Sequence, residues 1–512
     1  MKRLGPSSPP QFTPWIVWSC GLAAAAAGVG GALLLANWLL PLGREGIWQW
    51  SLRKQALPLL PWTWPAAIAL AVVGLAALDS LRLGRAPSRL STTLLVLCLT
   101  ICSGTLMVAF IVDDRDYPPR AAAAILGDAS MGYYLQATKV SSVADYLREV
   151  EPRTSRGHVP ERVATHPPGP VLYYRAARTW LSARPELMAR LLRLQEDWSG
   201  DRGLAAGLLV ARRVSTFGPD RSDLVIAFWA GLALTLLAPL VVPVAFWIGA
   251  VAADRRVGLT AAVPAACIPS VVCFSPSIET PGTLLAGLCV ALWLWALRDK
   301  AWPPALACGA LLMLGMFWTF GLLATAAVLF VIAAVGSLDT GRRRDLWAPV
   351  AAAAVGFLGL GAIGYLLPGY NTVTSMLASL ATQRQVMEDT ARPYLLSIPW
   401  NLYDFALFAG PSLVVMALFG TALSLSGSLR PRWIAGIGLG VIVTLAALVL
   451  LGSTRGEVGR IWVFLMPLML VPAALPISGL RGWSLMLVGL LVLAGQLAMA
   501  MVVNSHLNLV AP

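Results

Sequence analysis

The sequence predicts an all-α integral membrane protein with about thirteen transmembrane helices and one large polar loop. Of the 512 residues, 58% are hydrophobic and only 12% are charged, which is about half the charged fraction of soluble domains. The apolar residues form uninterrupted blocks of about twenty, the length that crosses a hydrocarbon layer of about 30 Å. Many such blocks along one chain exclude a soluble globular core.

The apolar blocks predict thirteen spans with polar segments between them. The first block is too long for a signal peptide and is followed by many others, so we interpret it as a retained helix. A break at Phe317–Trp318, where aromatic residues suit a membrane interface, separates the eighth span from the seventh. The predicted spans are 15–41, 60–80, 90–112, 222–252, 258–274, 281–297, 303–317, 319–337, 347–367, 401–426, 433–452, 461–477 and 483–503.

The formal charge of +13 would suggest a nucleic-acid partner in a soluble protein. Here the basic residues lie mostly in short loops between spans, so we expect them to contact the lipid bilayer and expect no nucleic acid. They fall on every second loop, which is the positive-inside pattern. This pattern predicts an inner (plasma) membrane protein with a cytoplasmic amino terminus. The carboxyl terminus would lie outside with segments 42–59, 113–221, 275–280, 368–400 and 453–460.

Segment 113–221 is over a hundred residues long and holds no apolar run of span length. Residues 119–148 and 184–213 mix apolar and charged side chains at near-helical spacing, which predicts helices lying in the membrane interface. Residues 157–170 contain several prolines and are predicted to form an ordered irregular loop.

The ionisable residues gather at span ends and in the outer segments, which favours chemistry at the outer membrane face over a path through the bilayer. Asp113, Asp114 and Asp116 follow directly after a span, and we interpret them as solvated acids that pair with nearby arginines. Asp128 has small and aromatic neighbours instead of charged ones. It is therefore the predicted general base.

His166 stands before two prolines that fix the backbone and before Gly169, which allows close approach of a ligand or of the chain. The residue types suit phosphate binding or a proton shuttle, and a proline-rich turn into an interfacial helix explains the same run equally well.

Two further outer turns carry candidate residues. Glu279 is the only acid on its turn between two spans, where it is either solvated or faces a polar cavity. Arg455 and Arg460 lie on an outer loop against the charge rule, and a phosphate ligand would explain their presence there.

The order of these features resembles the GT-C superfamily of membrane glycosyltransferases. It is most similar to the branch that holds the protein O-mannosyltransferases and the lipid A aminoarabinose transferase. Asp128 followed by Tyr133–Tyr134 is similar to the catalytic acid motif of that branch, although Ala129 stands where the family has a second acid. The run from His166 to Pro168 is similar to its Lys-Pro-Pro or His-Pro-Pro element.

Two more motifs carry the resemblance. Residues 275–279 occupy the place of the family's second loop acid, and residues 456–462 resemble a motif of bacterial members. The acid loop follows the third span instead of the first. We therefore interpret residues 1–89 as an amino-terminal two-helix addition, 90–480 as the catalytic module, and 481–512 as the last span with a short outer tail.

The resemblance implies an inverting glycosyltransferase of the cell envelope that works without a metal or another cofactor. It would move a sugar from a polyprenyl-phosphate donor to a hydroxyl group of a glycan, lipid or protein acceptor. Asp128 would be the catalytic base. The donor phosphate would be bound by His166, Arg455 and Arg460, and the sugar or acceptor by Tyr133, Tyr134, Tyr173 and Glu279.

Two other classes remain open. Prolines within spans favour a secondary transporter or lipid flippase, whereas the lack of an internal sequence repeat and the few mid-span charges count against it. A non-catalytic membrane scaffold would need a large loop that folds by itself and binds a partner.

Overall fold

The computed structural model describes residues 14–44, 48–51, 53, 62–83, 87–114, 117–128, 131–157, 159–274, 276–338, 346–390, 392–426 and 432–508. Within these residues the chain is helical apart from turns and one short antiparallel pair, β1 (Gly43–Arg44) and β2 (Trp48–Gln49). Nine helices in this described part are long and apolar enough to cross a membrane. The chain is an all-α, multi-pass membrane protein.

The nine span-length helices, as far as the structure describes the chain, each coincide with a predicted span. Two of them contain a 3-10 turn, named η, next to an α-helix. They are α1 (Pro14–Ala36), α2 (Thr63–Arg82), α3 (Arg89–Asp113), α10–η1–α11 (Arg221–Thr235, Ala238–Leu240, Val241–Ala252), α14 (Glu279–Asp299), η2–α16 (Phe320–Leu322, Leu323–Ser337), α17 (Trp347–Leu366), α21 (Trp433–Leu451) and α24 (Gly482–His506).

The other four predicted spans are apolar helices that are short or broken. Pro269, Gly410 and Pro467 lie at or near these breaks, and Gly410 has a φ of +94° that a helix cannot accommodate. The four are α12 with α13 (Arg255–Ala265, Pro269–Cys273), α15 (Trp302–Trp318), α19 with α20 (Tyr394–Ala409, Pro411–Leu425, bent by 101°), and η4 with α23 (Val463–Met469, Leu470–Gly479).

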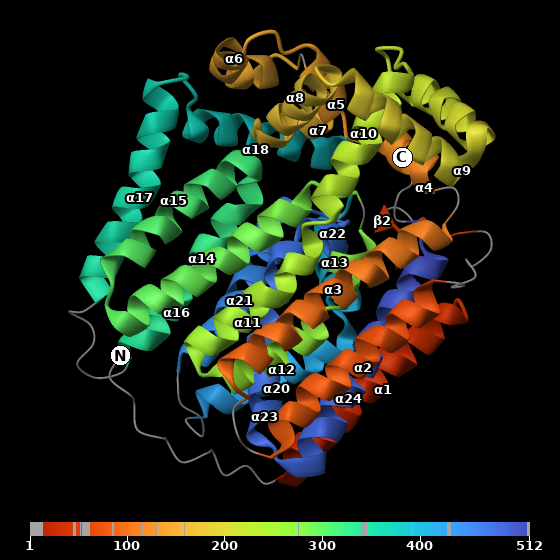
Figure 1. Ribbon diagram of the computed structural model, residues 1–512. Coiled ribbons are helices and arrows are strands. Elements are labelled where there is room, and N and C mark those ends of the chain that lie inside the picture. The colour runs from red at the N-terminus through yellow and green to blue at the C-terminus, as the bar shows by residue number, and fades with distance from the viewer. Residues whose placement is uncertain are drawn as a thin grey trace.

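The molecule contains two hydrophobic cores, which lie in different parts of the fold (Figure 1). One fills the bundle of apolar helices, and the other lies inside the large loop together with α10. The loop helices are α4 (Tyr117–Leu126), α5 (Tyr133–Thr138), α6 (Val143–Ser155), α7 (Glu161–Ala164), α8 (Gly169–Ser182) and α9 (Pro185–Val214). Figure 1 shows them gathered at one end of the bundle, near α18 (Thr372–Asp389).

The long segment 221–252 contributes residues to both hydrophobic cores. Helix α10 packs against α4, α8 and α9, whereas α11 packs against α12 and α14 of the bundle. This division explains why the apolar segment has 32 residues, when about twenty suffice to cross a bilayer. In the predicted irregular loop 157–170, α7 forms one helical turn and Pro168 caps the start of α8.

The first two helices pack on the last one. Helix α1 contacts α20 and α24, and α2 contacts α3 and α24, so α1 and α2 lie beside α24 in Figure 1. Helices α1 and α2 are thus part of the same bundle as the helices that follow them.

Loops with many arginines meet at one end of the bundle. Arg256 donates a hydrogen bond to the carbonyl of Leu480, and Arg255 donates to that of Pro87 over 3.3 Å. At the opposite end, Arg53 lies 3.2 Å from Asp114, and its backbone N–H donates to the carbonyl of His506. The large loop and the end of α24 therefore share this second end.

Candidate functional site

Four charged side chains of alternating sign meet where the loop core rests on the bundle. Arg162 of α7 lies 3.0 Å from Glu457, and Glu457 lies 2.5 Å from Arg460 of the short helix α22 (Val458–Ile461). Arg460 also faces Glu279, with 3.8 Å between its Nε and Oε1. These four residues form what we call the charge cluster. They come from three segments that are far apart in the sequence, and each is largely shielded from solvent.

The two carboxylates of the cluster differ in their local surroundings. A neighbouring hydroxyl group binds Glu279, whereas Glu457 has an unusual backbone conformation. Glu279 is the first residue of α14, and the Ser277 hydroxyl donates to its Oε2 over 2.6 Å while accepting from its backbone N–H over 3.1 Å. Glu457 has a φ of +56°, in the left-handed region that side chains with a Cβ rarely adopt. Such strain persists only where surrounding contacts impose it, and it is enriched at functional sites.

Each charged group of the cluster stabilises the ionised form of its neighbours. Burial alone would raise the pKa of Glu457, but Arg460, Arg162 and Arg392 outweigh it and hold that pKa below its usual value. Burial alone would lower the pKa of Arg460, yet Glu457 and Glu279 raise it. Both residues are therefore charged at neutral pH, inside a region that excludes most water.

His166 and Tyr133 border the cluster. The Nδ1 atom of His166 lies 2.9 Å from the carbonyl oxygen of Arg162. A carbonyl only accepts hydrogen bonds, so Nδ1 carries the proton and Nε2 keeps its lone pair. Burial lowers the pKa of His166 to about 4, although Glu279 opposes the shift. At neutral pH the imidazole of His166 is thus uncharged. Its Nε2 can accept a hydrogen bond, and the ring carries no positive charge for an anion. The Tyr133 ring packs edge-on against it at 5.6 Å.

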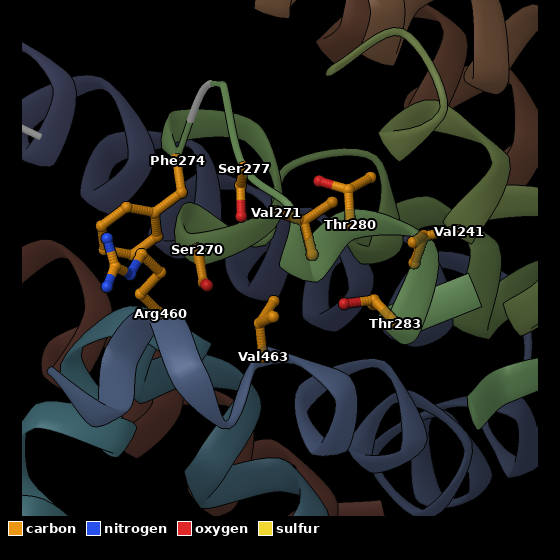
Figure 2. Close-up of a pocket in the computed structure, with 9 residues that line it drawn as sticks. All are labelled: Val241, Ser270, Val271, Phe274, Ser277, Thr280, Thr283, Arg460 and Val463. Atoms are coloured by element: carbon orange, nitrogen blue, oxygen red, sulfur yellow. The ribbon is translucent and has the colours of Figure 1, made fainter. Parts of the chain in front are cut away.

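A small cavity opens beside Arg460 (Figure 2). In this view Ser277 and Thr280 lie above Val463 of η4, and Ser270 lies beside Arg460 of α22. The cavity has a volume of about 10 Å³, roughly the room that one water molecule needs. Its lining combines hydroxyl groups and one cation with four apolar side chains, Val241, Val271, Phe274 and Val463. The polar residues that line it are Ser270, Ser277, Thr280, Thr283 and Arg460.

Tyr174 adds a buried hydroxyl near the cluster. Its side chain is 0% exposed, and its Oη has no hydrogen-bond partner in the described part of the chain. Burial raises the pKa of Tyr174 well above its usual value, and Tyr173, Tyr133 and Glu279 add to the shift. A buried donor without a partner is rare in native proteins, because it lowers stability unless a ligand or a water accepts its hydrogen bond.

Asp128 has partners elsewhere. Its Oδ2 accepts from the backbone N–H of Thr216 over 2.9 Å, and its Oδ1 accepts from the Ser215 hydroxyl over 3.4 Å. Among the described residues no hydrogen bond or ion pair joins it to the charge cluster. The carboxylate ties the end of α4 to the turn that follows α9.

Two of the predicted tyrosines also have defined partners. The Tyr134 hydroxyl donates to Asp223 over 2.8 Å, and the Tyr173 hydroxyl donates to the carbonyl of Ala230 over 2.7 Å. Both contacts fasten loop helices to α10. The structure thus brings Glu279, Arg460, His166 and Tyr133 together, whereas the hydroxyls of Tyr134 and Tyr173 serve the loop core.

Arg455 uses its guanidinium to join two loops. It donates to the carbonyl of Arg392 over 2.6 Å and to that of Gly452 over 3.2 Å, while Arg392 donates back to the carbonyl of Arg455 over 2.6 Å. Its charged group also lies over the ring of Tyr394. These contacts account for a basic residue on this loop without a ligand.

The sequence predicted solvated acids paired with nearby arginines at the end of α3, but Asp114 is only 4% exposed and Asp113 binds the start of α2. Asp113 accepts from the backbone N–H groups of Trp62 and Thr63, at the start of α2. Asp114 pairs with Arg53 and with Arg120. Asp116 and Ser275 lie outside the described residues.

Sequence reasoning missed three members of this region. Arg162 gave no signal beyond its position near His166, and Glu457 was noticed only within a motif. Tyr174 was not among the predicted tyrosines. Within the described residues, no group of three or more His, Cys, Asp or Glu side chains is arranged to hold a metal ion. No protein-family model matches the chain, and no curated protein matches it either.

Proposed function

We propose that this chain is a membrane glycosyltransferase that moves a sugar from a polyprenyl-phosphate donor to a hydroxyl group of an acceptor. The observation that carries the proposal is the meeting of Glu279 and Arg460 beside a cavity lined with hydroxyl groups. This meeting place lies between the apolar bundle and the polar loop, where the head group of a lipid substrate would reside. The motifs that resemble the GT-C superfamily supply Glu279, His166, Tyr133, Glu457 and Arg460 of this region.

The proposed reaction needs one base and one group that stabilises the leaving phosphate. The acceptor oxygen attacks the anomeric carbon, the bond from that carbon to the phosphate oxygen breaks, and its electron pair stays on the phosphate. The acceptor proton passes to a carboxylate. We assign this base role to Glu279 instead of Asp128, because Glu279 belongs to the charge cluster, whereas among the described residues no hydrogen bond or ion pair joins Asp128 to that cluster.

Arg460 is the group that we assign to the donor phosphate. Its fork of N–H donors fits phosphate oxygens, and fixed donors of this kind stabilise charge as it develops on a leaving group. Arg460 now contacts Glu457 and Glu279, so a bound phosphate would compete with one of these carboxylates. Arg162 is placed to help, since it shares Glu457 with Arg460.

The reaction would take place outside the cytoplasm. The arginine-rich loops lie at the opposite end of the bundle from the charge cluster, and loops rich in arginine and lysine favour the cytoplasmic side. The proposal therefore places the large loop and the carboxyl terminus on the outer face of the inner membrane, and the amino terminus inside.

A lipid flippase remains the second candidate because of one feature. Helices α19 and α20 form a pair bent by 101°, and Asp404 lies buried in α19. Broken helices with a buried acid are typical of transporter binding sites.

A reconstitution experiment separates the two candidates. The purified chain in liposomes would be given radiolabelled polyprenyl-phosphate-linked sugars and a crude envelope acceptor. A transferase releases polyprenyl phosphate and forms a new glycosidic bond, whereas a flippase only moves intact lipid across the bilayer. Movement of the lipid without any cleavage would overturn the transferase proposal.

A further inference from the structure

A second cavity lies at the same end of the bundle and is rich in aromatic rings. It has a volume of about 10 Å³, again roughly the room for one water molecule or one hydroxyl group. Three of its walls are the rings of Trp48, Trp400 and Tyr403, which come from β2 and α19. The other residues that line it are Leu42, Gly43, Asn401, Asp404, Leu407 and Gly456.

Two hydrogen-bond donors of this cavity are buried and unused. The Nε1 of Trp48 and the Oη of Tyr403 have no hydrogen-bond partner in the described part of the chain. An indole N–H only donates, and a phenol hydroxyl donates and accepts. Leaving such groups unpaired in a buried position costs free energy, so their presence together indicates a ligand or a water that completes them.

The same cavity offers a strong acceptor. The Asp404 side chain lies in the wall and is fixed by Trp50, whose Nε1 donates to Oδ1 over 2.5 Å, and by the backbone N–H of Gly459, which donates to Oδ2 over 2.7 Å. Each carboxylate oxygen keeps a further lone pair. A hydroxyl group accepts two hydrogen bonds and donates one, so its bonding pattern matches two unpaired donors and one carboxylate acceptor.

The two cavities share a wall. Gly456 lines the aromatic cavity, and Arg460, four residues later, lines the cavity of the charge cluster. Between them Glu457 contacts Arg460, and Gly459 contacts Asp404. The segment 456–460 thus contributes a lining residue to each cavity, which links the aromatic cavity to the proposed donor site.

We infer that the aromatic cavity holds a hydroxyl group of the acceptor, and that the acceptor is an uncharged carbohydrate. Flat aromatic rings with polar tips pack well against the C–H faces of sugar rings. The nine lining residues include the Asp404 carboxylate, which disfavours an acidic acceptor, and the Arg392 guanidinium lies over the ring of Trp48 at 5.1 Å. This inference rests on the proposed transferase function, because it names the class of acceptor that the same enzyme uses.

The first test needs no catalysis. The purified chain in nanodiscs would be irradiated with octyl glucoside that carries a diazirine on the sugar, and labelled peptides would be mapped by mass spectrometry. Labelling of the segments around Trp48 and Tyr403 is expected, with excess unlabelled octyl glucoside reducing it. An equivalent octyl glucuronide probe should label these segments several-fold less. Labelling elsewhere, or equal labelling by the charged probe, would overturn the inference.

The second test uses variants that remove one polar atom each. Tyr403→Phe keeps the ring and loses the hydroxyl, and Trp48→Phe loses the indole N–H. Each should reduce labelling by the glucoside probe and raise the acceptor KM about three- to tenfold, with a smaller change in donor KM. Tyr365→Phe, on an exposed residue of α17, is the matched control and should change neither quantity.

Different results would contradict the transferase proposal and the acceptor-site inference. Labelling of this cavity by the glucoside in a chain that transfers no sugar would support a carbohydrate site and overturn only the transferase proposal. Sugar transfer with an acceptor KM unchanged in both Tyr403→Phe and Trp48→Phe would support the transferase and overturn the acceptor site. Melting temperatures measured in parallel would identify a variant that is merely unfolded, and the other variant then decides.

Discussion

Arg162 and Glu457 form an ion pair, with 3.0 Å between Nη2 and Oε1, although 295 residues separate them in the sequence. This pair joins the large loop to the turn before the last two apolar segments. Glu457 in turn holds Arg460, which faces Glu279. The position of the loop on the bundle and the geometry of the proposed site therefore depend on the same contacts.

Removal of Arg162 should loosen the loop. Arg162→Ala leaves Glu457 partly buried without one of its two cations, and breaking such a pair costs about 3 kcal/mol. Faster proteolysis of the loop and a lower melting temperature in detergent are expected. Arg153→Ala breaks the solvent-exposed pair with Glu149 and should cost only about 0.5 kcal/mol. Equal losses in both variants would argue against a specific role for the Arg162 contact.

Substitutions at Glu279 and Asp128 should have different effects on kcat. Glu279→Gln removes the proposed base and should lower kcat by a factor of about 10² to 10⁴. Asp128→Asn keeps a side-chain oxygen that still accepts from the Thr216 N–H, so its kcat should stay within about threefold of the wild type. Both would be measured in the liposome transfer assay. Loss of transfer in the Asp128 variant with retention in the Glu279 variant would reverse our assignment.

The two arginines of the last outer loop should differ in their effect on the donor. Arg460→Lys keeps the charge but loses the fork of donors, and should raise the donor KM about ten- to a hundredfold. Arg455→Lys disturbs contacts to the carbonyls of Arg392 and Gly452 and to the ring of Tyr394. It should lower the melting temperature and leave the donor KM nearly unchanged. A larger donor effect from Arg455 would move the phosphate site to that residue.

His166 should make stability depend on pH. Its folded-state pKa of about 4 is lower than the value of 6.5 for an unperturbed imidazole, so the unfolded chain binds more protons between these values. Stability should therefore fall as the pH is lowered from about 6.5 toward 4. His166→Gln should flatten this dependence between pH 6.5 and 5, above the range in which Glu457 titrates. Melting curves at several pH values measure it, and an identical slope in the variant would contradict the burial of this imidazole.

Helix α17 depends on a close glycine contact with α15. A Cβ on Gly356 would lie 2.1 Å from the carbonyl oxygen of Leu306, whereas a Cβ on Gly359 would have no neighbour within 4 Å. Gly356→Ala should therefore destabilise the protein by about 1–3 kcal/mol. Gly359→Ala should be neutral or slightly stabilising, since alanine favours helices over glycine. Thermal melting in detergent compares the two, and equal effects would contradict this packing.

Hydropathy located the apolar helices well because a membrane span needs one long apolar run, which is a local property of the sequence. It did not show where a run is broken. The segment 401–426 looks continuous, yet Gly410 adopts a positive φ and the two helices meet at a bend of 101°. The segment 221–252 also looks like one span, because burial in the loop core and burial in lipid both select apolar side chains.

The site was harder to predict because its contacts are made over long distances in the sequence. Glu279 and Arg460 were identified as candidates from unusual charges on outer turns, but nothing local showed that they face one another. Asp128 has aromatic and small neighbours in the sequence, whereas its hydrogen-bond partners are Ser215 and Thr216. Asp404 was overlooked, although an acid within an apolar segment is a signal of function.

Cryo-electron microscopy of the chain in nanodiscs with a bound polyprenyl monophosphate tests the central claim most directly. We predict density for the phosphate within hydrogen-bonding distance of the Arg460 guanidinium, with the Glu279 carboxylate on the side from which an acceptor would approach. Density for the phosphate at another place, with Arg460 still paired to both Glu457 and Glu279, would contradict the proposal.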